Sequence, residues 1–272
     1  MKTLLNILLY SCLIHVTSAQ NNELDFSHHF QGTKCCFVLY DIKDNTYTRF
    51  NEEQCEKAYS PCSTFKIPNS LIALESGVAD NDECYLKWDS IQNPREPWMN
   101  KQSPFKYWSQ DHTMRTAIKN SVVWYYQEIA RRIGKERMQI KLNQLQYGNR
   151  DISSGIDNFW LCASLQISAN EQVEFLTRFY LENLIGFKAE NIQQVKEIIR
   201  FECTDGYTLY GKTGGGDCFE NKVIGWYVGF VETPDKVYIF AMNMIADDFS
   251  AFSNNRRIEQ TKAILEDLEV IN

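Results

Sequence analysis

The stretch GYTLYGKTGGG, from Gly206 to Gly216, decides the fold, because it can be interpreted as a phosphate-binding loop or as a β-strand. It matches the nucleotide-binding pattern G-x-x-x-x-G-K-[ST]. A phosphate-binding loop of that type needs a helix that begins at its Lys-Thr, so that the helix N-terminus faces the phosphates. Here three glycines follow Thr213, and glycine is a poor residue for a first helical turn. The interior Tyr-Thr-Leu-Tyr is instead typical of a β-strand. We therefore predict a strand over Tyr207–Thr213, with the glycines as its open end, where another part of the chain approaches closely.

Further strand patterns lie near both ends of the chain. The segments CCFVLYD (35–41) and TYTRF (46–50) predict one hairpin near the N-terminus. The segments IGWYVGFVE (224–232) and KVYIFAMNM (236–244) predict a second hairpin, which turns at Thr233-Pro234-Asp235.

Helical patterns dominate between these hairpins. Val122, Tyr126, Ile129 and Ile133 lie on one face of a predicted helix that ends at Gly134. Similar patterns cover residues 173–180 and a last helix over 257–268. The regular alternation of a parallel βαβ array is absent, so we predict an α+β fold: an antiparallel sheet built from both termini, flanked by helices, with a helical insert.

The N-terminus predicts export. Residues 1–19 begin with Lys2 in a short charged region, continue as an apolar run and end in small residues, which is typical of a secretory signal peptide cut after Ala19. Residues 20–272 then form a single domain in a periplasmic or secreted protein, where little ATP is available. No other segment is long and apolar enough to cross a bilayer, so we expect no membrane partner. The net charge of −7 disfavours a nucleic-acid partner.

The cysteines leave their state open. There are nine, and all but Cys12 lie after the predicted cleavage site. An exported chain could pair some of them as disulfides, or they could serve as small buried apolar residues. No C-x-x-C spacing occurs, so the sequence predicts no metal site.

The sequence lacks a histidine where a Ser-His-Asp hydrolase would need its general base. No histidine follows His112 and no G-x-S-x-G occurs, which excludes the usual Ser-His-Asp arrangement of α/β-hydrolases. Ser63-Thr64-Phe65-Lys66 supplies another base, because residues three apart on a helix share a face. Lys66 can take the Ser63 proton only as a neutral amine, and burial beside apolar neighbours would lower its pKa.

Five segments, in this order along the chain, resemble class D serine β-lactamases, the oxacillinase type. They are SPCSTFKIPNSLIALESG (Ser60–Gly77), the S-x-V of residues 121–123, the Y-G-N of residues 147–149, GIDNFWLCASLQIS (Gly155–Ser168), and the K-T-G of residues 212–214 followed by GWYVGFVE. The match covers nearly the whole chain after the leader. It implies the serine β-lactamase fold and hydrolysis of penicillin-type antibiotics, with resistance as the outcome.

The resemblance also implies the catalytic roles. Ser63 would be the nucleophile that opens the lactam, and Lys66 the base, carried as an N6-carboxylysine carbamate made from CO₂ or bicarbonate with no other cofactor. Trp160 would donate its indole N–H to that carbamate. Ser121 would relay a proton toward the lactam nitrogen, and Val123 would form a wall of the lysine pocket.

Substrate binding is implied in the same way. Lys212, Thr213 and Arg256 would hold the substrate carboxylate, with Gly214 completing the motif. The backbone N–H groups of the nucleophile and of Gly215 would form the oxyanion hole. Arg257 is the alternative carboxylate partner, and spacing to the last helix favours Arg256. Gly215 stands where many relatives carry a bulkier residue, which implies a wider cleft.

Two further expectations concern residues near the site. Residues 147–149 are expected to shape the cleft, and Cys62 to pack away from the nucleophile. The resemblance does not fix which penicillins, cephalosporins or carbapenems are hydrolysed, nor whether the protein forms a homodimer. β-Lactam sensor domains and penicillin-binding transpeptidases share these motifs, although they usually carry membrane segments or added domains.

Overall fold

The computed structural model describes residues 25–30, 33–101 and 103–272. The predicted signal peptide lies outside the described residues. Within them, no helix is long and apolar enough to span a bilayer.

One six-stranded antiparallel sheet forms the centre of the molecule, in the order β2-β1-β8-β7-β6-β5. The N-terminal hairpin joins the C-terminal hairpin because β1 pairs with β8, in a register that places Lys34 opposite Ile245. This confirms the predicted sheet built from both ends of the chain. The strands are β1 Lys34–Asp41, β2 Thr46–Phe50, β5 Arg200–Cys203, β6 Thr208–Phe219, β7 Lys222–Glu232 and β8 Val237–Ala246.

Strand β6 is longer than the sequence predicted. The prediction ended the strand at Thr213 and left the glycines open, but Gly214, Gly215 and Gly216 pair with Trp226, Gly225 and Ile224 of β7. The predicted strand is confirmed, but its end was placed too early. The backbone hydrogen bonds that β7 makes with the glycines outweigh their poor intrinsic strand propensity.

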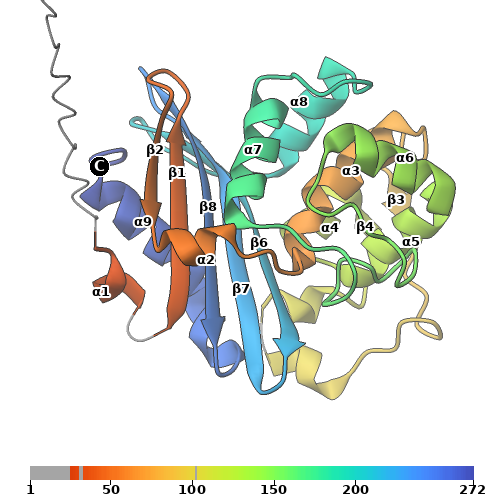
Figure 1. Ribbon diagram of the computed structural model, residues 1–272. Coiled ribbons are helices and arrows are strands. Elements are labelled where there is room, and N and C mark those ends of the chain that lie inside the picture. The colour runs from red at the N-terminus through yellow and green to blue at the C-terminus, as the bar shows by residue number, and fades with distance from the viewer. Residues whose placement is uncertain (1–24, 31–32, 102) are drawn as a thin grey trace, which may run out of the picture.

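Helices cover both faces of the sheet (Figure 1). On one face, α9 (Arg256–Asp267) lies with α1 (Ser27–Phe30), and a core that includes Phe37, Tyr227 and Phe240 fills the space beneath. On the other face, α7 (Ala169–Tyr180) packs against β1, β7 and β8. The two cores follow from the two-residue period of the strands, which sends alternate side chains to opposite faces.

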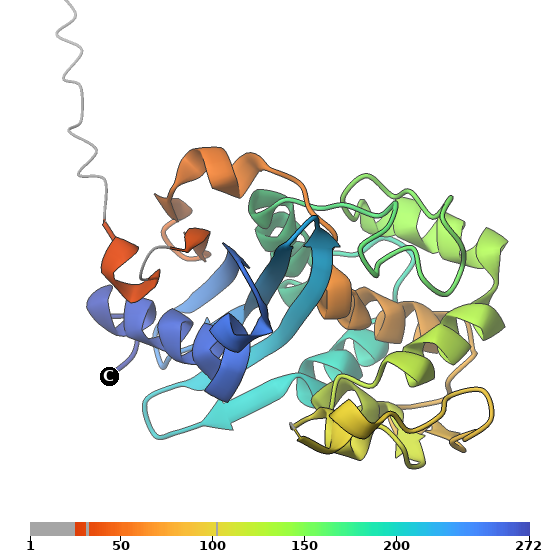
Figure 2. The ribbon, with the colours of Figure 1, turned by 90° about the horizontal axis from the view of Figure 1, so that it is seen from below.

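A mostly helical insert continues the second core away from the sheet (Figure 2). The predicted helix over residues 122–133 is confirmed as α5, which ends with Gly134 donating its backbone N–H to Ala130 O. The helices and short strands of this part are α3 Lys66–Glu75, α4 Met114–Lys119, α5 Val123–Ile133, α6 Lys135–Leu145, α8 Ala189–Ile198, β3 Tyr85–Leu86 and β4 His112–Thr113. Connecting segments contain α2 Glu52–Glu56 and the 3₁₀ helices η1 Cys62–Phe65, η2 Pro97–Lys101, η3 Phe105–Tyr107 and η4 Phe249–Asn255.

Candidate active site

Ser63 and Lys66 meet where η1 becomes α3. A 3₁₀ helix has three residues per turn, so side chains three apart are eclipsed. The Lys66 Nζ accordingly lies 2.7 Å from Ser63 Oγ. Lys66 has no exposed surface at all, and the Tyr126 ring centroid lies 5.5 Å from its Nζ. The structure thus places a hydroxyl and an amine in direct contact inside the protein.

Burial decides the charge of that amine. Removal from water lowers the pKa of Lys66 to about 7, because the charged form loses its hydration. Near neutral pH a large share of Lys66 is therefore neutral and can accept a proton. The sequence prediction of a buried lysine with a lowered pKa is confirmed.

Ser121 and Lys212 form a second contact beside the first. The Lys212 Nζ donates to Ser121 Oγ at 3.0 Å and to Thr213 O at 2.8 Å. Ser121 has a positive φ of 54°, a left-handed conformation that residues other than glycine rarely adopt. The Trp108 indole donates to the preceding carbonyl, Asn120 O, at 2.9 Å and helps to hold this conformation.

A third cation, Arg257 of α9, lies at β6. Its Nη1 donates to Gly214 O, and its guanidinium carbon lies 4.8 Å from the Phe252 ring centroid. Burial lowers the pKa of Arg257 to about 10. Burial and the charges of Lys66 and Arg257 hold the pKa of Lys212 well below its usual range. The site thus gathers three basic side chains that repel one another, and an anionic ligand would relieve that repulsion.

Gly214 allows β6 to approach the nucleophile. A Cβ on this residue would lie 2.8 Å from Pro61 O and 3.0 Å from Thr64 Cγ2, which is closer than real Cβ atoms pack. A Cβ on Gly215 would lie 3.2 Å from Arg257 Nη1. The missing side chains therefore bring the strand that carries Lys212 against η1.

Trp160 carries an unusual polar atom. The side chain is fully buried and its ring stacks on Phe65 at a centroid distance of 5.3 Å. Its carbonyl accepts a hydrogen bond from Ser60 Oγ at 2.8 Å, which anchors the backbone. Among the described residues, its indole Nε1 has no hydrogen-bond acceptor. Leaving a buried N–H without a hydrogen-bond partner costs free energy, so this indole is suited to a group that can accept its hydrogen bond.

Comparison with known proteins places this geometry in a family. The profile described as "Penicillin binding protein transpeptidase domain" matches residues 17–267. Beta-lactamase OXA-10 of Pseudomonas aeruginosa is 38% identical over 256 residues, covering 92% of each chain. The class D β-lactamase FUS-1 (OXA-85) of Fusobacterium nucleatum has a structure similar to this one, with a TM-score of 0.81 and 38% identity over 91% of this chain and 98% of that one.

The chain belongs to the class D serine β-lactamases. The α+β architecture matches that of the family's solved structures. Similarity also extends to a penicillin receptor: "Regulatory protein BlaR1" of Bacillus licheniformis is 36% identical over 222 residues, 82% of this chain but only 35% of that protein. The solved C-terminal domain of the "BlaR penicillin-receptor" of that organism has a TM-score of 0.80 with 33% identity over 90% of this chain and 94% of that one.

One residue beside the predicted site was ranked lower by the sequence. The sequence favoured Arg256 over Arg257, and the structure places Arg257 against β6, where it contacts Gly214. Spacing along the sequence does not fix the rotation of α9, so it could not indicate this contact. The role of Arg256 at the substrate carboxylate stays a prediction.

The structure places the remaining predicted residues less directly. Val123 is half-buried in the first turn of α5 and lines a cavity of about 250 Å³ beside Trp88 and Trp108, so its role at Lys66 stays a prediction. Asn149 accepts backbone N–H bonds from Asp151 and Gln166, which ties two loop segments together. This contact fits the shaping role expected for residues 147–149.

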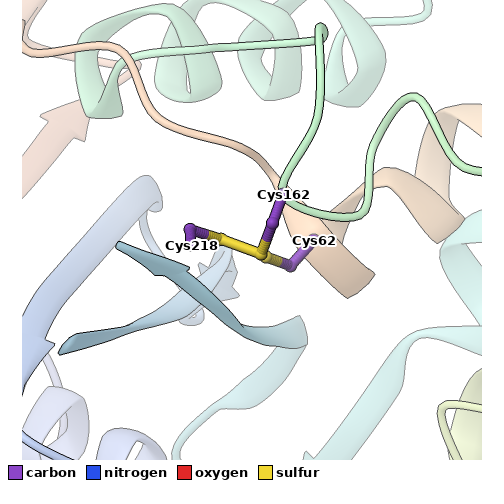
Figure 3. A group of neighbouring side chains, drawn as sticks. All are labelled: Cys62, Cys162 and Cys218. Carbon is purple, nitrogen blue, oxygen red and sulfur yellow. A yellow bond between two sulfur atoms is a disulfide. The ribbon is translucent and has the colours of Figure 1, made fainter. Parts of the chain in front are cut away.

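A disulfide was not predictable from the sequence. Cys162 and Cys218 are bonded although 56 residues separate them, and Cys62 lies beside them (Figure 3). Trp226 was also missed: its indole donates to Ser60 O at 3.0 Å and supports the segment before the nucleophile. Both features join residues that are distant in sequence, and no local pattern signals them.

The buried amine makes a testable contribution to stability. Because the pKa of Lys66 is lower in the folded chain than in the unfolded chain, protonation favours unfolding. This penalty is full below about pH 7 and is gone above the unfolded pKa of about 10.4. In CO₂-free buffer we expect Lys66→Met to raise the unfolding free energy by roughly 3–5 kcal/mol at pH 6 and by much less at pH 10. The gain at pH 6 should appear as a clearly higher Tm. Exposed Lys135→Met is the control, and equal gains at both pH values would contradict the lowered pKa.

Proposed function

We propose that the protein hydrolyses the β-lactam ring of penicillin-type antibiotics through an acyl-enzyme on Ser63, with carbamylated Lys66 as general base, and so confers resistance. The observation that carries this is the 2.7 Å contact between Ser63 Oγ and a fully buried Lys66 amine. A serine hydroxyl becomes a useful nucleophile when a base beside it can take its proton.

Acylation would proceed with one proton relay. Lys66 takes the Ser63 proton as Oγ attacks the lactam carbonyl, and the C–N bond breaks when the tetrahedral intermediate collapses. The lactam nitrogen then receives a proton through Ser121, whose Oγ accepts from Lys212. Backbone N–H groups of Ser63 and Gly215 would stabilise the oxyanion, where one donor is typically worth about 10²–10³ in rate.

Hydrolysis of the acyl-enzyme would use a carbamate on Lys66. CO₂ reacts with neutral amines, and burial supplies a neutral Lys66 near pH 7. The product is a carboxylate-like oxygen base that can activate water. The unpartnered Trp160 indole N–H supports this proposal, because a carbamate oxygen would give it the acceptor that the unmodified chain lacks.

Export completes the proposal. The leader-like residues 1–19 suggest a periplasmic or secreted enzyme, which would meet β-lactams before they reach their targets. The cationic groups of Lys212 and Arg257 suit the carboxylate that penicillins carry.

A receptor function is the second candidate, favoured by the similarity to BlaR1. A receptor would be acylated once and would stay acylated, because its deacylation is slow. The two functions share the first chemical step and differ only in the second, so turnover separates them.

The first test in solution is turnover itself. Purified protein without residues 1–19 should hydrolyse benzylpenicillin and a chromogenic cephalosporin over many cycles. Ser63→Ala should lower kcat about 10³-fold or more and leave no covalent adduct by intact-mass spectrometry. Ser90→Ala, at an exposed serine, is the control. A single stoichiometric burst would favour the receptor, and an adduct on Ser63→Ala would disprove the nucleophile.

The carbamate predicts a dependence on bicarbonate. Acid protonates the amine and releases CO₂, so degassed protein at mildly acidic pH should hydrolyse penicillin poorly and recover with added bicarbonate. Trp160→Phe keeps an aromatic ring beside Phe65 but removes the N–H donor. One charge-assisted hydrogen bond is worth about 1.5–3 kcal/mol, so this variant should need roughly 10- to 150-fold more bicarbonate for half-recovery. A flat response in both proteins would mean that Lys66 acts as a plain amine.

The two arginines can be distinguished by the substrate carboxylate. Arg257→Ala should raise KM for penicillins roughly 10- to 100-fold, since a hydrogen bond to a charged group is worth about 1.5–3 kcal/mol. Arg256→Ala should change KM less. A penicillin methyl ester, which lacks the carboxylate, should lose the difference between wild type and Arg257→Ala. A larger effect at Arg256 with the free acid would restore the original expectation.

A further inference from the structure

Three sulfur atoms meet beside the nucleophile (Figure 3). Cys62 begins η1, Cys162 lies in the segment after Trp160, and Cys218 lies near the end of β6. Cys162 and Cys218 form a disulfide, while the Cys62 Sγ lies 3.7 Å from the Cys218 Sγ as a free thiol. All three sulfurs lie within 4.8 Å of one another. The proposed β-lactam chemistry uses none of them.

The chain leaves room for this cluster at Gly216. A Cβ there would lie 2.5 Å from the Cys162 Sγ, 2.8 Å from the Cys62 Sγ and 3.1 Å from the Cys218 Sγ. A side chain at this position would displace at least one sulfur. The three cysteine side chains therefore pack against the backbone of Gly216.

We propose that reduction of the Cys162–Cys218 bond turns these three cysteines into a binding site for one thiophilic divalent cation, Zn²⁺ or Cd²⁺. Zinc–sulfur bonds of about 2.3 Å in a tetrahedral site place sulfurs about 3.8 Å apart. The Cys62 and Cys218 sulfurs already have this spacing, at 3.7 Å. Only the bonded pair must separate, and water fills the fourth position.

Loading of the metal begins with reduction of the disulfide. A phosphine reductant gives two electrons to the disulfide, takes oxygen from water as the phosphine oxide and leaves two thiols. The cation then binds as the three thiols release their protons to solvent. The disulfide-bonded chain offers a single thiol, so the oxidised protein does not bind.

The other sulfur and histidine groupings are weaker candidates. Cys36 interacts with Cys55 and Cys35, but these three sulfurs are not among the described groups that converge closely enough to hold an ion. His28, His29 and Asp267 converge at the surface, but the His29 ring already hydrogen-bonds the Asp267 carboxylate at 2.7 Å. Among the described residues, the cluster around Gly216 combines three soft ligands with burial of Cys62.

The location couples this site to the active site. Cys62 directly precedes Ser63, and Cys162 lies two residues after Trp160. A bound ion would join the segments that carry these two residues to the strand that carries Lys212. The site is nonetheless defined by metal binding, so it stands or falls independently of β-lactam hydrolysis.

The test is a Cd²⁺ titration of the protein in both redox states. The protein is reduced with a phosphine under anaerobic conditions, freed of reductant and titrated, while the ultraviolet thiolate-to-cadmium band and native mass spectrometry are recorded. We expect one tight equivalent in the reduced protein and none in the disulfide-bonded protein. If reduction alone loosens the fold, the ion should restore it, because metal binding then supplies folding free energy.

Cysteine variants identify the ligands. Cys62→Ser can still form the native disulfide, so its fold can be checked in the oxidised state; after reduction it should bind Cd²⁺ at least 100-fold more weakly. Cys218→Ser should show the same loss, and Cys203→Ser, at an exposed cysteine, should bind like wild type. Equal binding by reduced and oxidised wild type, or undiminished binding by Cys62→Ser, would overturn the proposal. So would a reduced protein that neither binds the ion nor refolds with it.

Discussion

Keeping the Lys66 amine out of water, 2.7 Å from the Ser63 hydroxyl, is the constraint that the rest of the site serves. A buried ammonium ion without a counter-charge is costly, and the chain avoids that cost by lowering the pKa rather than by supplying a carboxylate. Apolar and aromatic neighbours such as Phe65 and Tyr126 provide the dry surroundings. The 3₁₀ turn then supplies the alignment, because its three-residue period brings the two side chains together.

The substrate side of the cleft follows the opposite logic. Lys212 and Arg257 lie close enough to affect one another's charge, and no carboxylate in the described part of the chain forms an ion pair with either. Loss of the Lys212 proton relieves their repulsion, and the entry of an anion would relieve it as well. A bound carboxylate would raise the pKa of Lys212 again and so restore its full charge. Binding energy and protonation are therefore linked in this part of the site.

Much of this arrangement could be predicted from the sequence, and the exceptions have a common cause. The paired hairpins, the helix over residues 123–133 and the Ser63–Lys66 contact all rest on spacings within a few residues. The full length of β6, the choice of Arg257 and the Cys162–Cys218 bond each depend on a partner far away in the chain. Local patterns carry no information about such partners, and only the packed structure supplies it.

The pairing of β1 with β8 has a consequence for how the chain is made. Lys34 faces Ile245, so the strand that links the two hairpins is synthesised long after the N-terminal hairpin. Until it emerges, the N-terminal hairpin has an unpaired edge, and the sheet cannot close around either core. Contacts of such large sequence separation also slow folding, because a long loop must be closed before they form. A nascent chain cut short before residue 237 would therefore lack the strand that joins the two hairpins, and its N-terminal hairpin would keep an exposed edge.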